Sequence, residues 1–427
     1  MRNAAKSDAM IVPTIASRAE RLIYRVAGLP VALSALLVGS PTADATDPLQ
    51  TAFAWRYWHP DGAGEWSELI GGVIFWPLAL LVASLWFTMR NGRIIRRRNG
   101  RSIAFQISDQ FRLYFSDGVL APWYYIFSLH DEPERARSYL QRFETKPCLF
   151  LLLKRKRGSP LNDKRRFADY CAERQIRCVQ NVLYLNGADS SATLPDHDLF
   201  VKRSRGRGGR GAERWDRVAP DTFEGPNCER LGGDALLQRL VGRSRHSPLI
   251  VQRRLEPHSA IANLTTGALP TARVVTCLDE RGNPEVVAAM FRSSIGSNKT
   301  VDNMHAGGMG CLIDVDTGTL SRASNLGADA RVGWFSAHPD TGARIESRAL
   351  PLWGDAKELA LAAHRHFEDR VVIGWDIAIL EDGPIIIEGN GNPDLDILQR
   401  FMRIGFRRHR LGELMGHHLK NRLPAAA

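Results

Sequence analysis

Asp376, Glu388 and Asn390 have the clearest potential for chemistry, because the pattern around them places all three on one face of a β-hairpin. The stretch 371–387 is rich in β-branched and apolar residues except for a turn at Glu381-Asp-Gly383. This pattern is typical of two strands joined by a short loop that ends in glycine. A three-residue loop puts Asp376 opposite Glu388. Because side chains repeat every two residues along a strand, Asn390 then shares the face of Glu388.

Two carboxylates directly opposite each other repel, so this pairing predicts a cation between them. Ligands that are all oxygen select a hard ion, Mg²⁺ or Mn²⁺, which substrate phosphates usually complete. The alternative is an ordinary hairpin with carboxylates at its solvent-exposed end. The register is itself an assumption, because a two-residue loop would turn Glu388 to the other face of the sheet.

A glycine-rich basic loop is the second candidate site. Residues 198–203 have a strand pattern, and the eight residues 204–211 that follow contain four glycines and three arginines. Glycine lets backbone amides approach phosphate oxygens closely, and arginine supplies the charge. The loop contains the spacing G-x-G-x-x-G, but no long apolar helix follows, and no Gly-Lys-Ser/Thr closes it as in a P-loop. Its composition therefore predicts a flexible phosphate-binding loop of another kind.

The alternative for this loop is a disordered arginine–glycine segment that binds nucleic acid. The strand before the loop, with Lys202 on it, argues against that alternative. No aromatic residues are interleaved with the arginines to stack on bases. These features argue against nucleic acid as a partner.

Composition sets wide bounds on the protein. With 427 residues, 44% hydrophobic and 24% charged, the chain resembles an ordinary globular protein of two or three domains. Its net charge of +11 favours an anionic partner such as a phosphate-rich ligand, an anionic lipid or nucleic acid. The six cysteines contain no C-x-x-C pair, which favours reduced cytosolic thiols over a disulfide framework or a structural zinc site.

An uncharged segment, 69–89, is long enough to cross a membrane, because about 20 apolar residues suffice. Six arginines follow it within residues 90–101, whereas the segment 40–68 is acidic. The positive-inside rule then places both flanks in the cytoplasm and 40–68 outside. The alternatives are a buried core helix and, because Pro77 could break the span, a single interfacial helix.

The first apolar stretch, Val26–Gly39, has about 14 residues and is short for a spanning helix. Thr42-Ala-Asp-Ala45 after it resembles a cleavage site made of small residues. The stretch is therefore either part of a signal peptide or a short first span.

Six motifs occur in order over about residues 100–415 and together resemble the ATP-grasp superfamily, in its sugar-transfer-associated branch. They are Asn162–Phe167 at the start of a predicted helix over 161–174, Leu199–Lys202 with the glycine loop, Ile250–Leu255, Thr271–Arg273, Val301–Gly308, and Asp376 with Glu388-Gly-Asn390. The resemblance implies an α+β protein in which two α+β subdomains grip ATP. The domains would be a membrane-anchoring helical region (1–100), a helical region before the ATP-grasp part (101–195), a subdomain with the glycine loop (196–251) and one with the metal site (252–420).

The resemblance also implies roles for single residues. ATP would be bound by Lys164 and Lys202 through its phosphates, by the loop glycines Gly206, Gly208 and Gly209, and by an adenine hinge from Gln252 to Leu255. Arg273 and Arg292 would neutralise the transferred phosphoryl group. Asp376, Glu388 and Asn390 would hold Mg²⁺ or Mn²⁺, in agreement with the hairpin pattern.

The implied function is an ATP- and Mg-dependent ligase that activates a carboxylate as an acyl phosphate for attack by an amine or thiol. It would act at the inner (cytoplasmic) membrane with its ATP-grasp region in the cytoplasm, in envelope or polysaccharide metabolism and beside envelope-glycan machinery. A phosphotransferase of the same fold and a membrane-tethered nucleotide-binding module without turnover are the alternatives. Three departures leave the substrates open: the arginine-rich loop, Gln252 where many relatives have glutamate, and Asn392-Pro-Asp-Leu-Asp396 in place of a proline–glycine pair.

The basic run after Met89 should lie in the cytoplasm, because arginines resist translocation. A reporter enzyme that works only in the cytoplasm, fused after Arg101, should therefore be active. Activity from a reporter that works only outside the cytoplasm would overturn this placement, since ATP is a cytoplasmic substrate.

Overall fold

The structure is a computed structural model, and it describes residues 25, 26, 28–33, 47–153, 158–187, 192–206, 209, 211–304, 307–330, 333–420 and 422. Two expected features, Gly208 in the glycine loop and the cleavage-like Thr42–Ala45, lie outside these residues. So do His305 and Ala306 within the predicted loop motif 301–308.

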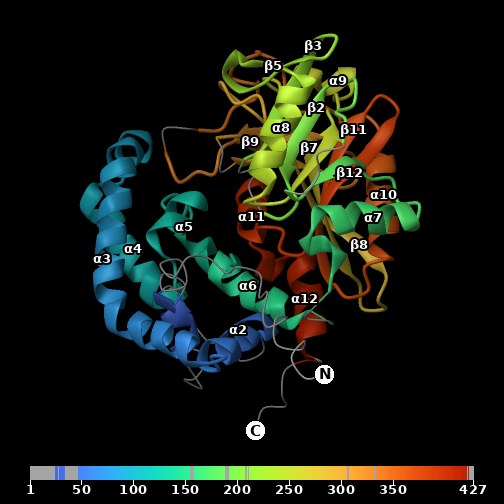
Figure 1. Ribbon diagram of the computed structural model, residues 1–427. Helices are drawn as coiled ribbons and strands as arrows, with labels where there is room; N and C mark the ends of the chain where they lie inside the picture. The colour runs from blue at the N-terminus through green and yellow to red at the C-terminus, as the bar shows by residue number, and fades with distance from the viewer. Residues whose placement is uncertain are drawn as a thin grey trace, which may run out of the picture.

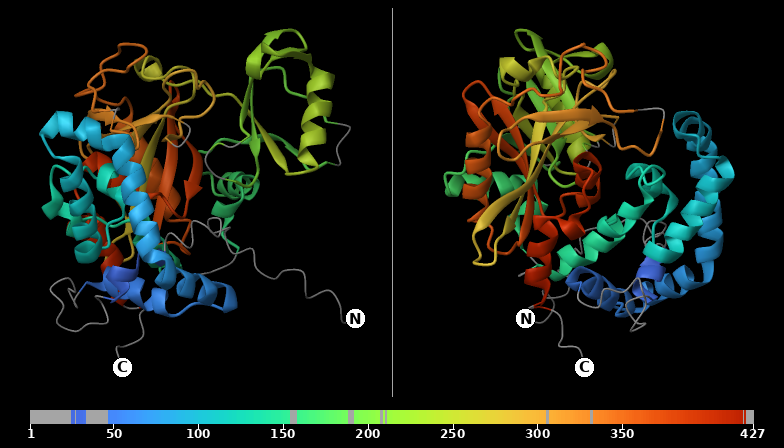
Figure 2. Two further views of the ribbon diagram at one scale, coloured as in Figure 1. Left: turned by 90° about the vertical axis from the view of Figure 1, so that its left-hand side faces the viewer. Right: turned by 180° about the vertical axis from the view of Figure 1, so that it is seen from behind.

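The first sheet is antiparallel, with the strand order β1-β6-β2-β3-β4-β5. Its strands are β1 (Asn181–Leu185), β2 (Leu199–Arg203), β3 (Glu213–Ala219), β4 (Thr222–Glu224), β5 (Arg230–Gly232) and β6 (Leu249–Arg253). One face packs against α8 (Gly233–Ser244) around the buried Trp215. Because residues alternate along β2, Leu199 and Val201 enter this core while Lys202 lies on the other face. The sheet and α8 form a lobe to one side of the larger body (Figure 2, left).

The second sheet is also antiparallel, with the order β10-β9-β8-β7-β11-β12. Its strands are β7 (Thr271–Leu278), β8 (Pro284–Ser293), β9 (Met309–Ile313), β10 (Leu320–Ser324), β11 (Val372–Leu380) and β12 (Gly383–Asn390). Cores lie on both faces, so every residue of β7 is buried. One core includes α7 (Lys164–Glu173) and α10 (Trp353–His364), and the other includes α11 (Leu395–Met402) and α12 (Arg410–Lys420). The short helix α9 (Ser259–Ala262) follows the linker between the two sheets.

The N-terminal part of the described chain is helical and lies beside the second sheet (Figure 1). Its helices are α2 (Pro48–Trp58), α3 (Ala63–Asn99), α4 (Ile103–Asp117), α5 (Ala121–Ile126) and α6 (Arg142–Leu151). They share one hydrophobic core with α11 and α12. Most described residues from the first apolar stretch, among them Val26 and Leu29, are buried, whereas Leu33 is exposed. The carbonyl of Val26 accepts a hydrogen bond from Tyr114 at 2.8 Å.

Helix α3 contains the predicted segment 69–89, and within the described residues it is the one helix long and apolar enough to cross a membrane. By length and composition alone this is weak evidence for membrane association. Figures 1 and 2 show α3 on the outside of the helical region.

The predicted segments need two boundary corrections. Strand β1 pairs with β6, so the first sheet spans residues 181–253 and begins before the expected boundary at 196. The predicted helix over 161–174 is α7, but it begins later, after its N-cap Asp163. The Asp163 carboxylate accepts from the backbone nitrogen of Arg165 at 3.0 Å, which leaves Lys164 as the first residue of the helix.

The hairpin of β11 and β12 confirms the predicted pairing of Asp376 with Glu388, but the three-residue loop is wrong. The loop has two residues, because Leu380 pairs with Gly383. A β-bulge adds one residue to β12 and so offsets the shorter loop. As a result Ile377 pairs with Ile386, whereas Asp376 pairs with Glu388. In a regular strand, side chains two positions apart lie on the same face. The bulge lets Ile386 enter the core while Glu388 faces the other way.

Gln399 on α11 joins the N-terminal helical part to the chain that follows α11. Its buried Oε1 accepts from the backbone nitrogens of Leu140 at 2.8 Å and Phe406 at 2.9 Å, and its Nε2 donates to the Leu140 carbonyl at 2.7 Å. Gln399→Leu leaves these buried groups unpaired and should lower the free energy of unfolding by about 2–4 kcal/mol, measured by urea denaturation. Gln238→Leu, on the exposed face of α8, is the matched control and should change it by less than about 0.5 kcal/mol. Equal effects of the two substitutions would contradict this role.

Candidate active site

Asp376, Arg273, Arg292 and Glu388 lie on four neighbouring strands of the second sheet. Asp376 on β11 pairs with Arg273 on β7 and with Glu388 on β12, so the strand registers align these three side chains. Arg292, at the end of β8, pairs with Thr271 at the start of β7. The sequence prediction placed these charged groups in one site, and the structure brings them together.

Asp376 is bound by two arginines. Its Oδ2 lies 3.1 Å from Nη2 of Arg273 and 2.9 Å from Nη2 of Arg292, and Oδ1 accepts from Nε of Arg273. All three side chains are buried. Burial alone would raise the pKa of Asp376, but the two guanidinium groups outweigh it and hold that pKa below its usual range. Asp376 is therefore an ionised anchor for the arginines and a poor base.

Asp302 and Thr271 complete the surroundings of Arg292, and the sequence analysis did not single them out. Nη2 of Arg292 lies 3.4 Å from Oδ2 of Asp302 and donates to Oγ1 of Thr271 at 2.7 Å. The Thr271 hydroxyl donates in turn to Asp302. Burial raises the pKa of Asp302, although Arg292 opposes the shift. Asp302 lies in the motif 301–308, which was the signal that could have identified it.

Lys164 and Lys202 approach Glu388 from α7 and from the first sheet. Nζ of Lys164 is 3.2 Å from Oε2 of Glu388 and donates to the Gly206 carbonyl at 3.0 Å. The pKa of Glu388 is lowered, because burial, which raises it, is outweighed mainly by Lys164. Burial lowers the pKa of Lys202 to about 8; Glu388 and Asp376 raise it and Lys164 lowers it further.

The described part of the glycine loop closes against the segment that carries Asp302. Gly206 and Gly209 have backbone φ angles of +137° and +67°, which residues other than glycine rarely adopt. A Cβ on Gly209 would lie 2.6 Å from Cγ1 of Val301, so glycine is needed for this close approach. The loop thus lies between Lys164 on one side and Val301 on the other.

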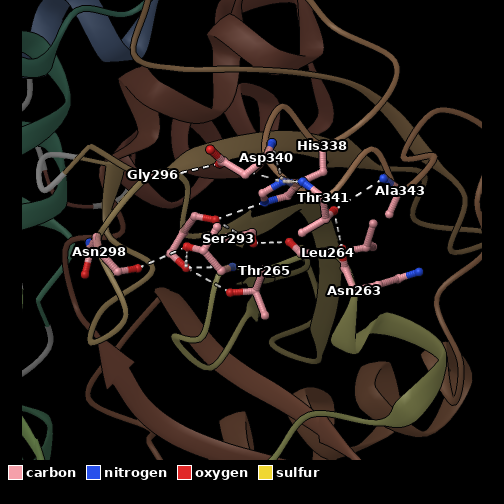
Figure 3. A network of polar contacts seen from close by, with 12 residues as sticks. Asn263, Leu264, Thr265, Ser293, Gly296, Asn298, His338, Asp340, Thr341 and Ala343 are labelled. Carbon is pink, nitrogen blue, oxygen red and sulfur yellow. Dashed lines mark hydrogen bonds and ion pairs between the residues drawn. The ribbon is translucent and has the colours of Figure 1, made fainter.

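A polar network fixes the segment that leads to Asp302 (Figure 3). Oγ of Ser294 lies 2.9 Å from the hydroxyl of Thr265, and the Ser294 carbonyl lies 3.1 Å from Nε2 of the buried His338. The backbone nitrogen of Gly296 donates to Asp340 at 2.9 Å. These contacts hold the end of β8 and the chain after it, so the position of Asp302 does not depend on a free loop.

Gln252 and Leu255 lie where the first sheet joins the second. Gln252, on β6, is buried and donates from Nε2 to Oδ1 of Asn181 at 2.9 Å. Leu255 is half-buried in the linker that follows. Arg254 between them is held by Asp198, with Nε 3.0 Å from Oδ2. The geometry is that of a connection between two lobes, and a role in adenine binding stays a prediction.

The repulsion expected between Asp376 and Glu388 is offset within the protein by cationic side chains, and the metal itself stays a prediction. Arginines neutralise Asp376, and Lys164 neutralises Glu388. The site also carries an excess of positive charge. Its side chains are four cations, Lys164, Lys202, Arg273 and Arg292, and three carboxylates, Asp302, Asp376 and Glu388.

The residues present still suit a divalent metal. Among the described residues, groups of three or more His, Cys, Asp or Glu that could hold a metal are absent, so an ion here needs Asn390 beside the carboxylates. Nδ2 of Asn390 is buried and has no hydrogen-bond partner within the described chain. Reversing the amide would place its oxygen there instead, which is a ligand for a hard cation.

Comparison with known proteins decides the family. Residues 154–410 match the sequence profile of sugar-transfer associated ATP-grasp proteins. The chain belongs to that family. The two antiparallel sheets with their helices are accordingly those of an ATP-grasp fold, as the sequence motifs predicted, and the family explains why two lobes face one charged site.

Solved structures similar to this ATP-grasp protein include D-alanine–D-alanine ligase from Bacillus anthracis, at 12% identity and a TM-score of 0.33, covering 61% of this chain and 66% of that one. They also include an L-amino acid ligase from Bacillus licheniformis, at 11% and 0.34, covering 65% and 53%. A third is N5-carboxyaminoimidazole synthase from Aspergillus clavatus, at 11% and 0.30, covering 54% and 44%. The chain thus spans about two thirds or less of these proteins' length. A search of curated proteins finds no match.

If Lys202 binds ATP phosphate, its pKa of about 8 makes the affinity depend on pH. The ammonium is present below this pKa and lost above it, so ATP affinity should fall about tenfold between about pH 7 and 9. In Lys202→Arg the charge persists and the fall should disappear. Lys357→Arg on α10 is the control, and its ATP affinity should fall with pH as in the wild type. Calorimetric titration measures the ATP affinity at each pH. An equal fall in affinity for the wild type and Lys202→Arg would contradict a phosphate contact by Lys202.

Proposed function

We propose that this ATP-grasp protein is an ATP-dependent ligase that activates a carboxylate as an acyl phosphate for attack by an amine or thiol. The observation that carries the proposal is the pair of buried guanidinium groups, Arg273 and Arg292, held by one ionised carboxylate, Asp376. Two preorganised cations stabilise the charge that develops on a transferred phosphoryl group. They need no reorganisation, because Asp376 already fixes their orientation.

Each nearby group has a role in this proposal. Lys202 and Lys164, with the glycine loop, bind the triphosphate and offset its negative charge. Mg²⁺ or Mn²⁺ would be held by Glu388 and Asn390 with Asp376 beside them, and when bound it supplies further positive charge to the phosphate oxygens. The glycine loop and the segment at Val301 exclude water from the reacting groups.

The reaction divides into two steps. In the first, an oxygen of the substrate carboxylate attacks the γ-phosphorus of ATP, and ADP leaves with the electrons of the broken P–O bond. In the second, an amine or thiol attacks the acyl carbon, and inorganic phosphate leaves. An ionised carboxylate needs no base, which agrees with the low basicity of Asp376.

A phosphotransferase is the second candidate, and one observation favours it. A hydroxyl acceptor must lose a proton, and Asp302 has a raised pKa, as a general base needs. Asp302 is also bonded to Thr271 and Arg292, so its position would be fixed for that role. The two candidates therefore differ in whether Asp302 takes part in proton transfer or only holds Arg292.

The cellular setting is part of the proposal. The apolar helix α3 supports membrane association, and the need for ATP supports placing the ATP-grasp lobes in the cytoplasm. The family description refers to sugar transfer, which supports a role in envelope or polysaccharide metabolism beside glycan machinery.

Trapping with hydroxylamine distinguishes the candidate reactions. Pools of carboxylates incubated with protein, ATP, Mg²⁺ and hydroxylamine should yield hydroxamates together with ADP. Formation of ADP and a phosphate ester with hydroxyl compounds alone would favour the phosphotransferase. Nucleotide binding without ADP release from any pool would favour the module without turnover.

Charge removal then tests the site itself. Glu388→Gln should raise the Mg²⁺ concentration for half-maximal turnover at least about tenfold, while the exposed Glu358→Gln on α10 should leave it unchanged. Asp376→Asn should also destabilise the fold, by about 3–5 kcal/mol in urea, because it leaves two buried arginines without their shared carboxylate. Wild-type Mg²⁺ dependence in Glu388→Gln would contradict the metal site.

A further inference from the structure

Helix α3 presents a continuous apolar face to the outside of the protein. Figure 2 (left) looks toward this side of the molecule, with α3 in front. The exposed large apolar residues of the helix are Trp66, Ile70, Val73, Ile74, Phe75, Leu78, Leu81, Val82, Leu85, Trp86 and Met89. Phe105 and Phe115 of the neighbouring α4 are exposed as well. This set, called here the α3 face, is far more extended than the isolated apolar residues of an ordinary surface.

The buried side of α3 mixes apolar and polar residues: Leu69, Leu80 and Ile95 lie in the hydrophobic core, and polar side chains are buried near the end of the helix. Thr88 and Asn91 are buried there. Nε2 of Gln110 on α4 donates to Oγ1 of Thr88 at 2.8 Å, and Oδ1 of Asn91 accepts from the backbone nitrogen of Ala330 at 2.8 Å. The protein therefore packs α3 through a mixed apolar and polar side and leaves a second, apolar side exposed.

The apolar stripe continues into a basic one on the same face. From Met89 the helical spacing leads to Arg93, Arg96 and Arg97, which are exposed and have no ion-pair partner within the described residues. At the other end of α3 the carboxylates are already paired, because Glu65 binds Arg56 at 2.8 Å. An antiparallel second copy would have to bring its acidic end to these arginines. Glu65 already binds Arg56 within its own chain. The unpaired arginines beside an apolar face therefore suit anionic lipid headgroups better than a second copy of the protein.

Contacts along its length prevent α3 from crossing a bilayer alone. Near its start, Gly72 packs directly on Arg25, so that a Cβ there would lie 2.5 Å from Cβ of Arg25. Further along, α4 runs antiparallel beside it, with Trp76 stacked on Tyr114 at 5.9 Å between ring centroids. A spanning α3 would carry Arg112 of α4, whose side chain is 56% exposed, into the hydrocarbon.

We propose that α3 lies in the plane of an anionic lipid bilayer, with the α3 face among the acyl chains and its basic end among the headgroups. The partner is thus a lipid surface, and the attachment is to one leaflet. Trp66 and Trp86, exposed toward opposite ends of the α3 face, suit the boundary between headgroups and acyl chains. This attachment does not depend on which reaction the ATP-grasp lobes catalyse.

Vesicle flotation of the full chain tests the surface. The protein should float with vesicles of phosphatidylcholine and phosphatidylglycerol, and less with phosphatidylcholine alone. Val82→Glu should weaken binding at least about tenfold, because it places a charge among acyl chains. The matched control is Val218→Glu on β3, which is similarly exposed and should bind like the wild type. Arg93→Gln should weaken binding to anionic vesicles roughly fivefold.

Thiol labelling separates an in-plane helix from a spanning one. Cys228 is exposed on the ATP-grasp lobes, and Gly64→Cys adds a thiol at the start of α3, where nothing lies within 4 Å of a Cβ. With protein bound to the outside of sealed vesicles, a membrane-impermeant maleimide should label both thiols without detergent. Protection of the thiol at residue 64 until detergent is added would overturn the in-plane arrangement.

Two further outcomes would also overturn the proposal. One is equal flotation of Val82→Glu and the wild type, which would place the lipid contact elsewhere. The other is a stable dimer in solution that Val82→Glu dissociates, with no binding to either vesicle, which would make the α3 face an interface between copies. Wild-type ADP formation and thermal melting of Val82→Glu in detergent would show that the variant is folded.

Discussion

The ion pairs that bind Asp376 to Arg273 and Arg292 are the constraint on which the rest of the site depends. Three charges inside a sheet are tolerated only because each guanidinium has a carboxylate and further acceptors, such as Thr271 and the Pro393 carbonyl. The strands that supply them must therefore keep one register. The buried apolar residues on both faces of β7 and β11 fix that register, so the core of the second sheet positions its chemistry.

The excess of cations over carboxylates suits the site to an anion. Lys202 shows the effect of burying a cation, because burial lowers its pKa to about 8. A bound polyanion would favour the charged form of Lys202 again. Lys164 is divided between Glu388 and the glycine loop, and therefore couples the position of that loop to the charge state of the second sheet. A triphosphate that drew Lys164 away would release the loop and free Glu388 for a metal in the same movement.

Sequence alone predicted the main features and missed their long-range partners. The pairing of Asp376 with Glu388 followed from local alternation, although two compensating features, a shorter loop and a bulge, produce it. Arg273 was identified through a family motif, but its contact with a carboxylate 103 residues away could not be read from spacing. Repulsion between the carboxylates alone therefore did not predict that arginines would offset the charge of Asp376 and that Lys164 would offset the charge of Glu388. Asp302 was missed because its contacts arise only where the start of β7 meets the end of β8.

The attachment of α3 to the rest of the protein affects how an acceptor substrate would arrive. Asn91 holds the segment at Ala330, and Arg400 of α11 holds the same segment at Asn325, with Nε 2.9 Å from that carbonyl. Helix α11 begins shortly after Asn390, so these hydrogen bonds connect the Asn390 end of the site to α3. With α3 in a bilayer, an acceptor carried on a lipid would diffuse in two dimensions past a site of fixed orientation. Its effective concentration would be high, and weak recognition of its headgroup would suffice for turnover.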